Sequence, residues 1–139
     1  MTDTNEMINA VPGGVPLGAD AVAAAIDACL RCVQSCTTCA NADIAEDDVV
    51  EMRRCIAQCL NCADVCDATA RLLSRPAYSE PAVLEPLLQA CVRTCTSSAE
   101  ECARHAPHHV HCALCEKVCR ACIEACTALL GSEAFAALR

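Results

Sequence analysis

The chain has 139 residues, a formal net charge of −8 and only ten basic residues, which are scattered along its length. This length favours one domain, and the lack of a basic stripe argues against nucleic acid as a partner. Aromatic residues are limited to Tyr78 and Phe135, cysteine occurs 16 times, and no apolar run is long enough to predict a membrane span.

Pro and Gly interrupt the first part of the chain, so we expect residues 1–19 to be a mobile N-terminal tail. Residues 20–139 are predicted to form the bundle described next. Its first helix is expected at about 20–44, with Asp20 as the cap. The second is expected at about 46–73, because the acidic residues 46–48 suit a helix N-terminus and the segment SRPAYSEP ends the helix.

The third helix is expected at about 80–105 and the fourth at about 107–130, where Pro107 fits the first turn and Gly131 follows the last. Short connections favour antiparallel neighbours. The sequence therefore predicts an all-α protein, an antiparallel up-down-up-down four-helix bundle with a cysteine-lined core.

The cysteines follow alternating steps of 3 and 4 residues on all four predicted helices, as the a and d positions of a coiled coil do. One step is missing between Cys95 and Cys102, and Ser98 occupies it. The full set is Cys29, Cys32, Cys36, Cys39, Cys55, Cys59, Cys62, Cys66, Cys91, Cys95, Cys102, Cys112, Cys115, Cys119, Cys122 and Cys126.

In an antiparallel bundle these positions stack as layers. One end of the bundle carries the connection between the first and second helices and the connection between the third and fourth. Counted from that end, the layers are Cys39, Cys55, Cys102 and Cys112; then Cys36, Cys59, Ser98 and Cys115; then Cys32, Cys62, Cys95 and Cys119; then Cys29, Cys66, Cys91 and Cys122. On each helix, the line of inward-facing positions that carries the cysteines is called its stripe. Beyond the last layer the stripes continue as Val and Leu, and we call that end the closed end. Beyond the first layer they continue with His, Met and Asp, and we call that end the mouth.

Ordinary core packing explains the thiols poorly, because small thiols bury little apolar area. A full set of disulfides is also disfavoured, because i,i+3 and i,i+4 side chains have Cβ atoms about 5–6 Å apart and a disulfide needs about 3.5–4.5 Å. Two thiolates that share a metal ion span at most about 4.6 Å, twice a metal–sulfur bond of about 2.3 Å, which suits this spacing.

Soft thiolates select Cu(I), zinc or iron–sulfur clusters. One Cu(I) per thiolate leaves a neutral core, whereas zinc with four thiolates leaves about −2 per layer in a dry interior. Iron–sulfur ligands usually lie in loops rather than inside helices. Multiple Cu(I) ions are therefore the favoured ligand, with zinc as the next alternative.

The motifs CLRCVQSCTTC, CIAQCLNCADVC, CVRTCTSSAEEC and HHVHCALCEKVCRACIEAC resemble those of the bacterial copper storage proteins over roughly residues 20–130. The resemblance implies a four-helix bundle that binds many Cu(I) ions, metal admission at the end lined by His or Met, and a homotetramer. Ser98 departs from the full pattern and leaves the number of sites open.

The candidate residues for metal admission at the mouth are Met52, His105, His108, His109, His111 and Asp43. Met52, His105 and His109 lie three residues from a cysteine along its stripe, whereas His111 is off the stripe and a weaker candidate. The alternative interpretation of the histidines is a solvated helix connection.

The function expected from the sequence is cytoplasmic storage or buffering of Cu(I), without enzyme activity. The cytoplasmic location is expected because the first residues lack the basic and apolar regions of a secretory signal. A low-capacity metal carrier or a zinc-binding protein is the main alternative, and a redox thiol buffer is a third. Donors and acceptors of copper, and the route of its release, are not evident from the sequence.

Overall fold

A computed structural model describes residues 2–139, and six α-helices make up most of them. The helices are α1 (Asp3–Asn9), α2 (Ala19–Ala45), α3 (Arg53–Leu73), α4 (Pro81–His105), α5 (Val110–Leu130) and α6 (Glu133–Leu138). Two short 3₁₀ segments, η1 (Val49–Met52) and η2 (Pro76–Tyr78), precede α3 and α4. No β-strand occurs within residues 2–139, and none of their helices is both long and apolar enough to cross a membrane.

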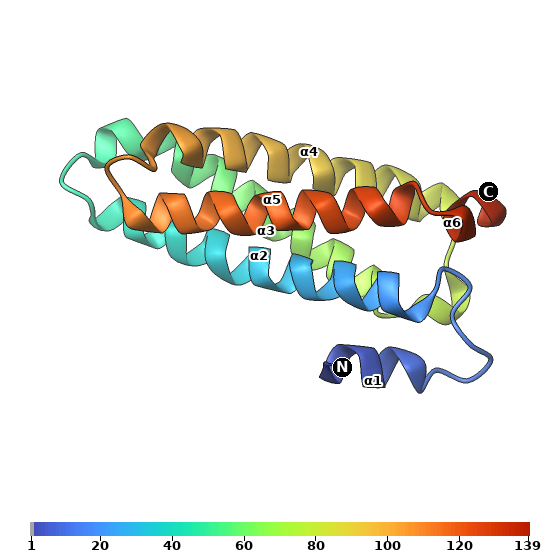
Figure 1. The fold of residues 1–139 in the computed structure, drawn as a ribbon. Helices are drawn as coiled ribbons and strands as arrows, with labels where there is room; N and C mark the ends of the chain where they lie inside the picture. Colours follow the sequence, from blue (N-terminus) through green and yellow to red (C-terminus); the bar gives the residue numbers. More distant parts are fainter. Residues whose placement is uncertain (1) are drawn as a thin grey trace.

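The four long helices form an antiparallel bundle, which confirms the predicted fold class. Helix α2 packs against α3 and α5, and α4 packs against the same two helices, so each long helix has two antiparallel neighbours. The α2–α3 and α4–α5 connections lie together at one end, and the α3–α4 connection and α6 lie at the other (Figure 1). The first of these ends is the mouth and the second is the closed end.

Two helix starts differ from the expected bounds. Helix α3 begins at Arg53 rather than near residue 46, and α5 begins at Val110 rather than near residue 107. The acidic residues expected to cap the second helix have other partners, because Glu46 and Asp48 both contact His109. The connection at the mouth is therefore longer than the sequence pattern indicated.

The segment before residue 20 also differs from the expected mobile tail, because it contains helix α1 packed along α2 (Figure 1). Thr2 and Asn5 form a reciprocal capping box at its start. The Thr4 hydroxyl donates a 2.6 Å hydrogen bond to Asp27 of α2, and the side chains of Ile8 and Leu17 are buried. These contacts give the segment a docked position that its Pro and Gly content did not suggest.

Apolar side chains fill the closed end. The buried set includes Val22, Ile26, Leu73, Leu84, Leu88 and Leu129. Helix α6 adds Phe135, whose side chain is fully buried and whose role the helical pattern did not predict. This end therefore has an ordinary apolar core, which stabilises the bundle and separates the thiols from solvent on that side.

Candidate metal centre

Every cysteine side chain points into the bundle. All 16 are free thiols, and each is at most 1% exposed to solvent. The reason is the spacing: residues at alternating steps of 3 and 4 lie on one face of a helix, and all four long helices turn that face inward. The interior is thus a column of sulfur atoms in place of the usual leucines.

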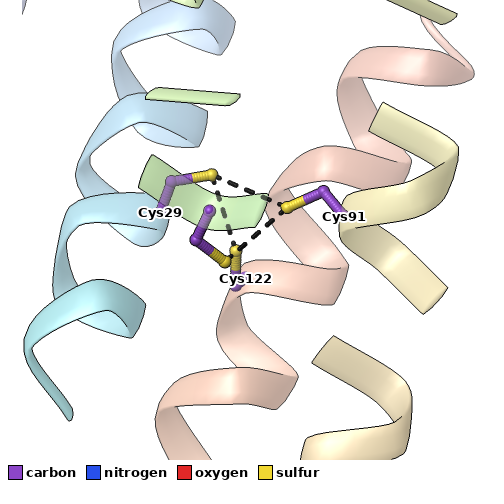
Figure 2. Close-up of side chains that lie close together, drawn as sticks. Cys29, Cys91 and Cys122 are labelled. Atoms are coloured by element: carbon purple, nitrogen blue, oxygen red, sulfur yellow. Dashed lines mark hydrogen bonds between the residues drawn. The ribbon is translucent and has the colours of Figure 1, made fainter. Parts of the chain in front are cut away.

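The predicted layers are found in the structure. In the layer nearest the closed end, the Sγ atom of Cys29 lies 3.7 Å from that of Cys122 and 3.9 Å from that of Cys91 (Figure 2). In the next layer, Cys62 and Cys95 are 3.5 Å apart, and Cys32 lies 3.7 Å from Cys62. Each layer brings together side chains from helices that are distant in sequence.

Sulfur atoms of different layers are equally close. The Sγ–Sγ distances are 3.6 Å for Cys36–Cys119, 3.6 Å for Cys66–Cys95 and 3.8 Å for Cys59–Cys102. A disulfide bond is about 2.05 Å long, so these are contacts between reduced thiols. The layers therefore form one continuous array in which neighbouring metal ions could share a bridging thiolate.

Ser98 is the one polar interruption within the four layers. Its Oγ atom lies 3.5 Å from the Sγ of Cys119, 3.7 Å from that of Cys59 and 3.8 Å from that of Cys36. A hydroxyl is a poorer ligand than a thiolate for a soft metal ion. The layer of Ser98 consequently offers three thiols where its neighbours offer four.

Several groups of four thiols have the separation that a metal ion needs. The Sγ atoms within each group lie within 4.8 Å of one another. These groups include Cys29, Cys66, Cys91 and Cys122; Cys32, Cys36, Cys62 and Cys119; and Cys39, Cys59, Cys102 and Cys115. A metal ion between them would need no large movement of the helices.

Hydrogen bonding and burial set the protonation of the thiols. The Cys32 thiol donates to the Cys119 sulfur over 3.7 Å. The hydrogen bond to Cys119, together with burial, raises the pKa of Cys32. Hydrogen bonds with Cys115 and Cys32 lower the pKa of Cys119 to about 6. Binding of metal ions to protonated thiols such as Cys32 must displace protons, because the thiolate is the ligand.

At the mouth, His111 and Asp43 extend the array with nitrogen and oxygen atoms. The Nδ1 atom of His111 lies 3.3 Å from the Sγ of Cys39 and 3.6 Å from that of Cys112. The Cys112 thiol donates to Oδ1 of Asp43 over 3.7 Å. Asp43 is fully buried, and this burial raises the pKa of its carboxyl group.

The other mouth residues have different surroundings. The ring of His105 faces Glu101, with 3.2 Å between Nε2 and Oε1, and His108 is exposed. His109 contacts Glu46 through Nδ1 and lies 3.1 Å from Asp48 through Nε2. Met52 is fully buried. Two of the six predicted residues, His111 and Asp43, join two cysteines in a four-residue group of ligand atoms, and His111 was the weaker candidate.

Glu101 is a mouth residue that the sequence reasoning missed. Its side chain is buried, and it contacts Arg54, Arg104 and His105. The i,i+4 spacing from Glu101 to His105 was a signal that could have identified the pair. Glu101 is therefore the carboxylate that the His105 ring contacts at the mouth.

A helical bundle with this interior belongs to the class of thiolate-rich proteins equipped for soft metal ions. Comparison with known proteins narrows the class. The family model described as copper storage protein matches residues 19–131, so the chain belongs to the copper storage protein family.

Two solved structures are similar over most of the chain. The copper storage protein Ccsp from Streptomyces lividans, loaded with 10 copper equivalents, is 43% identical with a TM-score of 0.87, and the match covers 91% of this chain and 97% of that one. A structure of copper loading to a cytosolic copper storage protein from the same organism, with five coppers, is 45% identical with a TM-score of 0.80, covering 81% and 94%.

A more distant relative comes from Bacillus subtilis (strain 168). The uncharacterized cysteine-rich protein YhjQ is 26% identical over 106 residues, which cover 76% of this chain and 93% of YhjQ. The match spans most of both chains, so the relationship concerns the bundle as a whole.

Proposed function

We propose that this protein stores many Cu(I) ions on the thiolates of its bundle core. The observation that carries the proposal is the continuous array of 16 buried, reduced thiols with sulfur–sulfur contacts within and between layers. Thiolates are the ligands that Cu(I) prefers, and one ion per thiolate leaves the dry interior without net charge. Family membership and the copper-loaded structures of Ccsp support the same function.

Copper is proposed to reach the array through the mouth. The closed end is packed with Leu and Phe side chains, whereas the mouth offers His111 and Asp43 beside Cys39 and Cys112. These side chains can hold an ion while it loses its carrier and before it reaches thiols deeper in the bundle. His105 and His109 engage carboxylates instead, so their part in admission is secondary.

Storage here means binding without chemical conversion. The thiols are buried and redundant, and the proposed role is that of a cytoplasmic copper buffer rather than an enzyme. A copper storage protein from Streptomyces lividans that is described as cytosolic supports the location. A homotetramer remains part of the proposal, as the family resemblance implies.

An anaerobic Cu(I) titration of the reduced protein against a competing chromophoric chelator tests the function. Storage predicts uptake of roughly one Cu(I) per thiolate, on the order of 16 per chain by the neutral-core argument. Saturation at one to four equivalents would instead indicate a carrier. Stable disulfides with little bound metal would indicate a redox thiol buffer.

A further inference from the structure

Contacts between the sulfur atoms group most of the array into triangles. Cys62 and Cys66 are one turn apart on α3, and Cys95 faces them from α4. The Sγ–Sγ distances in this group are 3.5 Å for Cys62–Cys95, 3.6 Å for Cys66–Cys95 and 3.9 Å for Cys62–Cys66. Each of these fully buried thiols therefore contacts both of the others.

The same arrangement occurs three more times without sharing a cysteine. Two of these triangles again combine a pair four residues apart on one helix with a thiol from a neighbouring helix, and the last takes one thiol from each of three helices. Their Sγ–Sγ distances are 3.6–4.0 Å. The members are Cys32, Cys36 and Cys119; Cys55, Cys59 and Cys102; and Cys29, Cys91 and Cys126.

A triangle of thiols is the coordination that a trivalent metalloid requires. As(III) forms three bonds to sulfur and keeps a lone pair at the apex of a pyramid, so it needs no fourth ligand. Its bonds are similar in length to the zinc–sulfur bond of about 2.3 Å, and at bond angles of about 95° they place the sulfurs about 3.4 Å apart. The sulfurs of Cys62, Cys66 and Cys95 would approach one another by about 0.1–0.5 Å, which small side-chain rotations can supply.

The charge balance suits a dry interior. Arsenous acid, As(OH)₃, is uncharged at neutral pH. At each step an arsenic–sulfur bond forms, an arsenic–oxygen bond breaks, and the thiol proton leaves with the hydroxyl group as water. One As(OH)₃ and three thiols thus give one As(SR)₃ and three water molecules, with no change in oxidation state. Reactants and product are all uncharged, so no charge has to be buried or expelled.

The bundle also holds each triangle in place before anything binds. Side chains four residues apart point in the same direction from one helix, and the packing of α3 against α4 fixes the position of Cys95 opposite Cys62 and Cys66. A small dithiol offers two sulfurs that lose their freedom on binding, whereas the triangle offers three that are already ordered. Burial then protects the arsenic–sulfur bonds from hydrolysis.

We propose that the thiol triangles bind trivalent metalloids of the arsenous acid class, with Cys62, Cys66 and Cys95 as the most compact site. Four triangles allow about four such ions per chain. The inference goes beyond copper storage, because it assigns the array a second class of cargo with a different coordination number and an uncharged entering form. It is tested without copper.

The test is an anaerobic titration of the reduced, copper-free, full-length chain with sodium arsenite, in the presence of an equimolar dithiol competitor. Native mass spectrometry counts the bound arsenic atoms, and thiol titration counts the sulfurs that each of them consumes. We expect about four As(III) per chain and the loss of three thiols for each. Transfer of the arsenic to the dithiol, or consumption of two thiols per arsenic, would overturn the proposal.

Two double variants locate the sites. Cys62→Ser with Cys95→Ser leaves one thiol in the most compact triangle, so arsenic uptake should fall from about four to about three. Cys39→Ser with Cys112→Ser removes a contacting pair outside the four triangles and should keep the uptake at about four. Equal uptake by the two double variants would refute the assignment of these triangles.

A Cu(I) titration of the same variants keeps this inference separate from the proposed function. Both double variants should lose about two Cu(I), because each lacks two thiolates. A failure of copper storage would appear in that titration, whereas a failure of the metalloid sites would appear only with arsenite. Helical circular dichroism reports whether each variant folds, and if a double variant unfolds, Cys95→Ser and Cys39→Ser alone decide the question.

Discussion

Replacing Ser98 with cysteine tests whether capacity follows the number of core thiols. Ser98 is fully buried, and its hydroxyl lies 3.5–3.8 Å from the sulfurs of Cys119, Cys59 and Cys36. Sulfur–sulfur contacts elsewhere in the array are 3.5–4.0 Å, so a thiol at this position falls within the same range. The larger atom should reduce the stability of the metal-free bundle by no more than about 1 kcal/mol.

The expected gain in Ser98→Cys is about one Cu(I) per chain, because each thiolate neutralises one ion in a dry core. Native mass spectrometry of the copper-saturated protein counts bound ions individually and can resolve a change of this size. Ser98→Ala, which adds no ligand, should leave the capacity unchanged. Cys59→Ser, in the same layer, should lower it by about one ion.

An unchanged capacity in Ser98→Cys would refute this reasoning, provided that thiol titration finds one more reduced thiol than the wild-type 16. That result would mean that capacity depends on cluster geometry and not on the count of thiolates. A loss in Ser98→Ala would point the same way, since that variant removes no sulfur.

Three further predictions concern stability and pH. Burial raises the pKa of Asp43, so its contribution to folding is present below the unfolded pKa of about 3.9 and is lost as the pH rises through the folded value. Asp43→Asn should therefore increase the free energy of unfolding of the metal-free protein at pH 7 by about 1 kcal/mol. A decrease measured by urea titration would contradict this prediction. Hydrogen bonds to neighbouring thiols and burial raise the pKa of Cys32 and Cys66. These thiols therefore stabilise the fold below the unfolded pKa of about 8.5 and lose that contribution as the pH rises towards their folded values. The metal-free protein should be less stable to urea at pH 10 than at pH 8, and equal stability would show that the two thiols ionise normally. Phe135→Ala should destabilise the metal-free bundle by about 3 kcal/mol through loss of core packing at the closed end, whereas Tyr78→Ala, at a side chain that is 93% exposed, should change the unfolding midpoint little.

The sequence alone determined the class of the fold and the thiol array. Alternating steps of 3 and 4 on four segments can be satisfied only by helices that share one interior, and short connections make neighbouring helices antiparallel. The layers followed from this register, and the contacts of Cys62 with Cys95 and of Cys29 with Cys122 agree with them. Periodicity predicts these features well because it depends only on local helix geometry.

The tertiary structure decided what lies at the two ends of the bundle. The helical spacing ranked His105 and His109 above His111. In the structure, the ring of His105 contacts Glu101, and the ring of His109 contacts Glu46 and Asp48. Helix α5 begins at Val110, so His109 is its N-cap residue and lies outside the helical register on which its ranking rested, whereas the Nδ1 of His111 lies 3.3 Å from the Sγ of Cys39. Such starts depend on partners from other helices.

The same limitation applies to the docking of α1 on α2 and of Phe135 at the closed end, since both segments are short and have little periodicity of their own. Short helices are marginal in isolation and are stabilised by the surface on which they pack. Local sequence thus determined the long helices and their sulfur core, whereas contacts distant in sequence determined the arrangement of the mouth and the closure of the opposite end.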